Sequence, residues 1–130
     1  MKQENLDAML AGYIRCALWS STDNTDESGG EPLDANYRAE DLESDTIAYM
    51  RTECSSFLEA HAGDIGVNYG QAGHDLWLTR NGHGTGFWDR DGVWPYDGRR
   101  LAEAAQALGE CCLLLSDEGT IFLEPMTRGS

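Results

Sequence analysis

The segment GHDLWLTRNGHGTGFWDR, residues 73–90, dominates the interpretation of this chain. It places two short aromatic-rich runs, at residues 75–79 and at residues 86–89, on either side of an Asn-Gly pair. Aromatic and apolar runs around an Asn-Gly pair are typical of a β-hairpin. The segment therefore predicts a hairpin in which Trp77 lies opposite Phe87.

Amphipathic helices are predicted before and after this hairpin. Apolar residues recur at a helical period over residues 5–19, over residues 45–61 and from Leu101 to Leu108. Near the C-terminus, two apolar runs flank the turn sequence SDEG at residues 116–119, which predicts a second hairpin. The expected order is α-α-β-β-α-β-β. Because two hairpins need a further layer for stability, we expect an α+β fold with helices on one face of a four-stranded antiparallel sheet.

The length of 130 residues corresponds to a single domain. A chain of this size buries roughly two-thirds of its unfolded surface, so its core needs no disulfide. The four cysteines form no CxxC pair and follow no secretion signal, which favours free thiols. Residues 20–38 are expected to form a long acidic surface loop, and residues 128–130 a tail without a structural role.

Acidic residues outnumber basic ones by 23 to 9, which gives a formal net charge of -14. This charge disfavours direct binding to nucleic acid or to an anionic membrane. It is compatible with a partner protein that has a basic surface, or with high solubility alone. The sequence contains no apolar run long enough to span a membrane and no signal-peptide region, so a cytoplasmic location is expected.

The negative charge is concentrated in one part of the chain. Residues 20–64 contain twelve acidic and two basic side chains, whereas residues 74–100 contain four of each. The first region predicts an acidic binding surface, which a basic groove on another protein could accept in place of nucleic acid. A solvated helix face beside a polar loop is the simpler interpretation. The residues expected to form the acidic surface are Asp23, Asp26, Glu27, Glu31, Asp34, Asp41, Glu43 and Asp45.

Residues 73–90 also resemble a segment that is shared, nearly unchanged, by a family of small acidic proteins encoded by bacteriophages and prophages. The resemblance extends to residues 17–21, 26–34 and 117–119, and so spans most of the chain. It implies an origin in a mobile genetic element and a role in the cytoplasm of an infected bacterium. The family has no established activity, so the resemblance carries over no catalytic residue and no cofactor.

The aromatic residues of the predicted hairpin indicate a second binding surface. Large aromatic side chains would lie on both faces of one short ribbon, so one face would be core and the other either covered or exposed. An exposed face would bind a partner or, alternatively, a second copy of the chain in a homodimer. The residues of this surface would be Trp77, Arg80, His83, Phe87, Trp88 and Trp94.

Polar residues of the same segment allow an enzymatic interpretation. Asp75 and Asp89 would face each other across the hairpin with His74 and Arg80 nearby, which resembles the acid–base pair of a hydrolase. No nucleophile or oxyanion motif accompanies them. A metal site is not expected either, because His74 and His83 would lie well over about 10 Å apart along an extended strand.

The leading expectation is therefore a non-enzymatic phage or prophage protein, without metal or cofactor, that binds a host macromolecule. It would use the acidic surface and the aromatic hairpin, as a counter-defence inhibitor that mimics nucleic acid does. Its partner would be a host protein with a basic surface rather than nucleic acid or a membrane. A hydrolase-like enzyme and a structural accessory protein that dimerises are the two alternatives.

Overall fold

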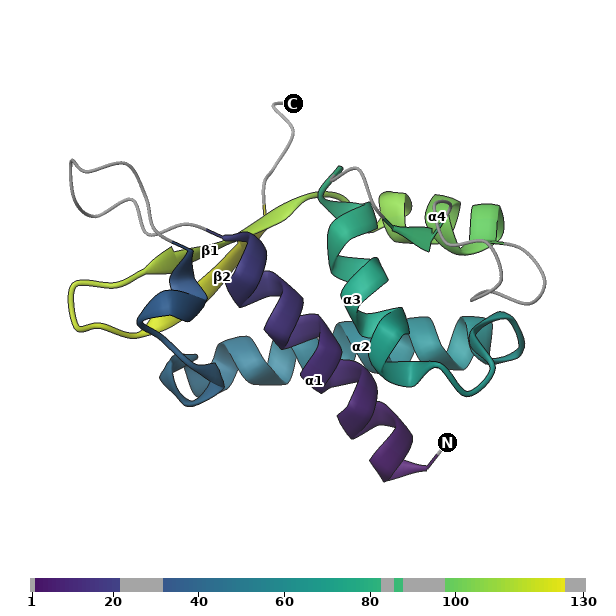
Figure 1. The fold of residues 1–130 in the computed structure, drawn as a ribbon, viewed down its shortest axis with the longest axis horizontal. Coiled ribbons are helices and arrows are strands. Elements are labelled where there is room, and N and C mark those ends of the chain that lie inside the picture. The colour runs from purple at the N-terminus through teal and green to yellow at the C-terminus, as the bar shows by residue number, and fades with distance from the viewer. Residues whose placement is uncertain (1, 22–31, 83–85, 88–97, 126–130) are drawn as a thin grey trace.

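A computed structural model describes residues 2–21, 32–82, 86–87 and 98–125 (Figure 1). In Figure 1, α1 and α3 cross in front of the long helix α2, and the tip of a β-hairpin and α4 lie at opposite ends of the molecule. Two short 3-10 helices, η1 and η2, precede α2 along the chain. The elements are α1 (Gln3–Ser20), η1 (Leu33–Ala35), η2 (Ala39–Asp41), α2 (Ser44–Ile65), α3 (Tyr69–Arg80), α4 (Gly98–Ala107), β1 (Cys111–Leu115) and β2 (Ile121–Pro125).

The predicted four-stranded sheet is wrong, because the described residues are mostly helical and contain only a two-stranded antiparallel sheet. The first predicted hairpin does not form, since residues 75–79 lie inside helix α3. The Asn-Gly pair ends that helix instead of turning a hairpin. Gly82 has a φ of 73°, the left-handed conformation that commonly follows a helix C-terminus. Asn81 donates a hydrogen bond to the Trp77 carbonyl and accepts one from the backbone N–H of Cys111.

Contact between α3 and α1 explains why this segment is helical. Gly73 lies so close to α1 that a Cβ atom there would sit 1.9 Å from the carbonyl oxygen of Met9. A Cβ atom at Gly12 would likewise sit 2.1 Å from the carbonyl oxygen of Gly70. Glycines that would weaken an isolated helix therefore let the two backbones touch. This tertiary packing overrides the β propensity of residues 75–79.

The helices predicted on either side of this segment are confirmed. α1 and α2 contain the predicted residues 5–19 and 45–61. α2 departs from helical geometry at His61 (φ -129°, ψ 23°), where its end was predicted, and adds a final turn before Gly66. Gly66 follows α2 with a φ of 66°, a backbone conformation that glycine adopts readily.

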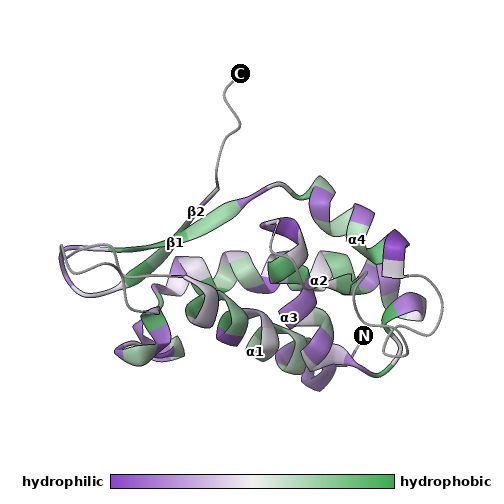
Figure 2. Cartoon of the chain, turned by 45° about the horizontal axis from the view of Figure 1, so that its top comes forward, coloured by the Kyte–Doolittle hydropathy of each residue, from purple (hydrophilic) through white to green (hydrophobic). Residues whose placement is uncertain are grey.

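The C-terminal elements are also confirmed. α4 is followed by Gly109, whose φ is 81°. The β1–β2 hairpin is antiparallel, with Leu113 opposite Leu123, and turns through Gly119 at a φ of 84°. Figure 2 shows α4 as alternating green and purple residues, which is the pattern of a helix with one buried apolar face. That buried face consists of Leu101, Ala102 and Ala105.

The core forms where α1 packs against α2 and α3. The rings of Tyr13 and Trp77 meet edge to face with centroids 5.3 Å apart, and Phe57 stacks on Phe87 at 5.8 Å. Aromatic pairs in these geometries contribute about 0.5–1.5 kcal/mol beyond their buried area. The largest fully buried side chains are Trp77, Tyr13, Phe87, Met9, Leu33, Met50, Ile65, Leu76, Leu101, Ile121, Thr79 and Asp75.

The segment that leads into α2 is attached to the outer edge of β2. Leu42 forms a parallel bridge with Ile121, and the backbone N–H of Glu43 donates to the Ile121 carbonyl at 2.9 Å. One turn into α2, the Thr46 hydroxyl accepts a hydrogen bond from the backbone N–H of Leu123 at 3.2 Å. These contacts hold the start of α2 and the strand β2 side by side.

Candidate functional site

The described residues of the predicted aromatic surface lie in the core. Trp77 is 2% exposed, and its indole N–H donates to the Ser20 hydroxyl at 2.8 Å. Phe87 and Arg80 are buried as well. These three side chains therefore form no surface that a partner or a second copy could reach. The remaining members, His83, Trp88 and Trp94, lie outside the described residues.

Arg80 is the centre of a buried polar network that joins three helices. Its guanidinium forms an ion pair with Glu53 of α2 and donates to the Tyr13 hydroxyl of α1 at 2.9 Å. It also donates to the carbonyl oxygens of Leu108 and Gly109, which follow α4. The Tyr13 hydroxyl in turn donates to Glu53 at 2.9 Å. The guanidinium is buried and donates hydrogen bonds to Tyr13, Glu53 and the two carbonyl oxygens, which indicates a structural role.

Of the described members of the hydrolase-like cluster, His74 and Asp75 are in contact, whereas Arg80 points away from them on the same helix. Asp75 is fully buried and accepts a hydrogen bond from Gln71 at 2.8 Å, with the His74 ring nitrogen 3.4 Å away. Arg80 follows Asp75 by five residues on the same helix, so the two side chains point about 140° apart around its axis. Asp89 lies outside the described residues. The described residues therefore separate Arg80 from Asp75, and the predicted pair of Asp75 with Asp89 stays a prediction.

The predicted acidic residues separate into three environments. Asp23, Asp26, Glu27 and Glu31 lie outside the described residues. Asp41 accepts a hydrogen bond from the backbone N–H of Arg38 at 2.8 Å and so caps η2. Asp34 is exposed beside α1, in a groove that also contains arginines. Glu43 and Asp45 alone come together in one hollow.

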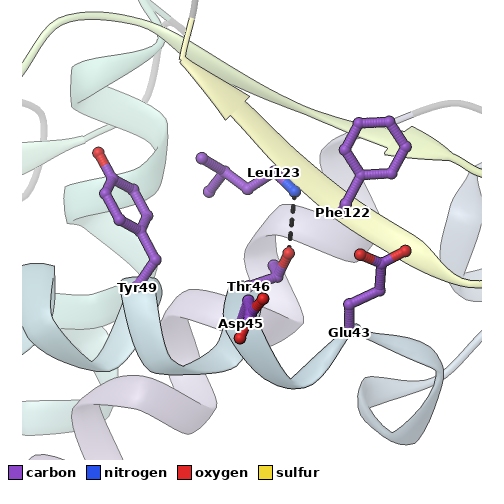
Figure 3. A pocket seen from close by; sticks show the side chains of 6 residues that line it. All are labelled: Glu43, Asp45, Thr46, Tyr49, Phe122 and Leu123. Carbon is purple, nitrogen blue, oxygen red and sulfur yellow. Dashed lines mark hydrogen bonds between the residues drawn. The ribbon is translucent and has the colours of Figure 1, made fainter.

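That hollow is a pocket of about 330 Å³ between the start of α2 and strand β2 (Figure 3). Two carboxylates and two aromatic rings are among the groups that line it. In Figure 3 the rings lie on either side of Leu123, above the first turns of α2. The lining residues are Glu43, Asp45, Thr46, Tyr49, Phe122 and Leu123.

Local structure fixes the two acidic residues. Glu43 directly precedes α2, where its N–H is bonded to β2 and its carboxylate accepts a hydrogen bond from the Thr120 hydroxyl at 2.8 Å. Asp45 lies in the first turn of α2, where the helix dipole favours a negative charge. No lysine or arginine is among the residues that line this pocket.

The secondary structure around Tyr49 and Phe122 determines the face on which each ring lies. Tyr49 follows Asp45 by four residues and therefore lies on the same face of α2. Phe122 points to the opposite face of β2 from the fully buried Ile121. Tyr49 is 43% exposed. Burial and the Glu53 carboxylate raise the pKa of Tyr49, so its ring stays neutral at physiological pH.

This combination of groups suits a cation. Carboxylates form charge-assisted hydrogen bonds with ammonium and guanidinium groups, and aromatic rings attract the same cations through their faces. The volume is at the lower end of the range for ligand pockets, about 300–1,000 Å³. The pocket therefore has the size and the chemical groups that suit one ammonium or guanidinium group.

Tyr49 and Phe122 were not among the predicted site residues. Their positions carried a signal, because each is a large aromatic residue outside the fully buried stripe of its element. Met50 and Cys54 define the buried stripe of α2, which leaves Tyr49 on the solvent side. The contact between α2 and β2 was not visible in the sequence, since the two elements are separated by more than fifty residues.

Searches for a metal site, for a membrane-spanning helix and for similar proteins gave no further indication of function. Among the described residues, no three His, Cys, Asp or Glu side chains are grouped so that they could hold a metal ion. None of the helices described is both long enough and apolar enough to cross a membrane. Comparison with family models, with curated proteins and with solved structures found no match.

Proposed function

We propose that this chain is a non-enzymatic, phage- or prophage-encoded protein that binds a basic surface of a bacterial host protein. The acidic pocket at the start of α2 is the proposed contact site. The observation that carries this proposal is the meeting of Glu43 and Asp45 with the rings of Tyr49 and Phe122 in one hollow. An exposed lysine or arginine of the partner would enter it.

The net charge of the chain supports the same class of partner. A formal charge of -14 attracts a basic protein over long distances and accelerates its association. Much of this charge belongs to residues 20–64, which end in α2. Host proteins that bind nucleic acid have such basic grooves. We therefore favour a counter-defence role in the host cytoplasm, in which the acidic surface takes the place of nucleic acid.

Comparison of pocket variants with a charge-matched control tests the proposal. The pocket variant carries Glu43→Gln and Asp45→Asn, and a second variant carries Tyr49→Ala. The control carries Glu103→Gln and Glu118→Gln, which remove the same charge from exposed positions elsewhere. Each protein is immobilised and used to capture proteins from host lysate, and the affinity of the captured partner is then measured with purified components.

We expect the pocket variant and Tyr49→Ala each to weaken binding of the captured partner by about tenfold or more. The control should bind within about twofold of the unmodified protein, because its two charges lie outside the pocket and salt screens single exposed charges at a distance. Equal losses of affinity in the pocket variant and the control would show that the interaction depends on net charge and not on the pocket. Capture that is unaffected by all three variants would contradict the proposal.

A further inference from the structure

A second hollow lies on another side of the molecule, between α1 and the η1–η2 segment. It has a volume of about 650 Å³, well within the range of ligand-binding pockets. Figure 1 shows η1 and η2 beside the C-terminal half of α1. We refer to this hollow as the α1 groove. It contains none of the residues that line the acidic pocket.

An apolar stripe of α1 forms the floor of the α1 groove. Leu10, Ile14 and Leu18 follow one another at intervals of four residues and so lie on one face of the helix. The stripe extends about 12 Å along the helix axis. Each of these side chains reaches the groove surface with only a small exposed fraction, and Tyr37 contributes an aromatic ring from the opposite wall. An elongated apolar group fits this floor.

Three arginines line the α1 groove, although the chain has only nine basic residues in all. Arg51 donates to Asp7 at 2.9 Å, so these two charges are paired with each other. Arg15 and Arg38 are exposed, and their side chains form no hydrogen bond or ion pair with any residue that the structure describes. One carboxylate, that of Asp34, faces them in the same groove. The groove therefore keeps a local excess of one positive charge.

We propose that the α1 groove binds an amphipathic anion, namely an aliphatic or aromatic carboxylate. The apolar body of such a ligand would lie on the stripe formed by Leu10, Ile14 and Leu18. Its carboxylate would accept hydrogen bonds from Arg15 and Arg38, which come from opposite walls of the groove. Asp34 opposes the anion and keeps the interaction weak. This site is independent of the acidic pocket and does not rest on the proposed partner protein.

Three ligands with the same alkyl chain length separate the contribution of the apolar chain from that of the head-group charge. They are decanoate, decanol and decyltrimethylammonium. Binding is measured by calorimetry below the micellar concentration, and methyl shifts in NMR spectra locate the bound chain. If net charge alone governed binding, a protein of charge -14 would prefer the cation. We expect the opposite order, with decanoate bound more tightly than decanol and decanol more tightly than the cation. Methyl shifts should be largest at Leu10, Ile14 and Leu18.

Charge variants provide a second readout. Because one exposed ion pair contributes up to about fivefold in affinity, Arg15→Gln and Arg38→Gln should each weaken decanoate binding by about that factor. Asp34→Asn should strengthen it, and none of the three should alter decanol binding. Arg100→Gln on α4 removes the same charge outside the α1 groove and is the control. All four positions are exposed, so far-UV circular dichroism and urea unfolding should show an intact fold.

The proposal would be overturned by tighter binding of decyltrimethylammonium than of decanoate. Equal affinities for decanoate and decanol would also overturn it, because the arginines would then contribute nothing. The same conclusion follows if Arg100→Gln weakens decanoate binding as much as Arg15→Gln does. Methyl shifts confined to residues outside the α1 groove would place the ligand elsewhere and reject the site.

Discussion

Arg80 was predicted to lie on a binding surface, but it is buried inside the protein. On a hairpin surface it would have contacted a partner, but within α3 it closes a network with Glu53 and Tyr13. A buried charge that loses its partner is left without compensation in a medium of low polarity. The network therefore restrains the relative positions of three helices.

Arg80→Ala is expected to lower the free energy of unfolding by about 3–5 kcal/mol, because it leaves Glu53 with an unpaired buried charge. Urea unfolding followed by circular dichroism measures this change. Arg51→Ala is the matched control, since it breaks an ion pair with Asp7 that is exposed to solvent. Its effect should be much smaller. Similar losses in the two variants would contradict a buried, structural role for Arg80.

The buried thiols predict a loss of stability at alkaline pH. Burial raises the pKa of Cys111 to about 11 and raises that of Cys54 further. In the unfolded chain a cysteine ionises near about 8.5, so the folded state holds the proton more strongly. The stability from this difference is complete below about pH 8.5 and falls as the pH rises towards 11, by up to about 1.4 kcal/mol per pH unit and thiol.

Urea unfolding between pH 8 and pH 10.5 checks this prediction. Cys111→Ala should flatten the decline of stability with pH, even if the variant is less stable at every pH. Cys112→Ala at the half-buried neighbouring position is the control and should keep most of the slope. A free energy of unfolding that stays constant, or rises, across this range would refute the argument.

At the level of elements, the contact between α1 and α3 is the critical feature of the fold. Gly73→Ala should destabilise the protein by about 3 kcal/mol or more, because the new methyl group would overlap the α1 backbone. Gly63→Ala is the matched control, since a Cβ atom there meets nothing within 4 Å inside α2. It should stabilise the helix by about 0.5–1 kcal/mol. Thermal unfolding that shifts equally in both variants would argue against the close helix contact.

The sequence predicted correctly those helices and strands that bury a single face or run of apolar residues. α1, α2 and α4 each have an apolar stripe that matches a helix, and the C-terminal hairpin has two apolar runs around a turn sequence. α3 lacks such a pattern, because Leu76, Trp77 and Leu78 are all buried and the helix is enclosed on most sides. Its Asn-Gly end resembled the turn of a hairpin. The roles of Gly70 and Gly73 depend on α1, which only the tertiary structure brings near.

The candidate site was predictable only in part, for a similar reason. The charge distribution pointed to Glu43 and Asp45, since both stand at the start of a predicted helix within the acidic region. The aromatic walls depend on the attachment of β2 to α2 through Thr46 and Leu123. A contact between residues so far apart in the chain leaves no local pattern in either segment.

The whole molecule combines two hollows of opposite character. The acidic pocket lies where α2 meets β2, and the α1 groove with its arginines lies where α1 meets the η1–η2 segment. Both use a short connecting segment, residues 32–43, as part of their structure. An excess of acidic residues elsewhere strengthens the first site and opposes the second. The two sites are therefore expected to respond in opposite directions to a general change in protein charge.

The most direct measurement is an NMR titration of the protein with the tripeptide Gly-Arg-Gly and with its citrulline analogue. The two peptides have nearly the same shape, but only the first has a charged guanidinium group. We predict backbone shifts at Thr46, Tyr49 and Leu123 with the arginine peptide alone, and their loss in the Glu43→Gln, Asp45→Asn variant. Equal shifts with both peptides, or shifts spread over all acidic residues, would contradict the acidic pocket as the binding site.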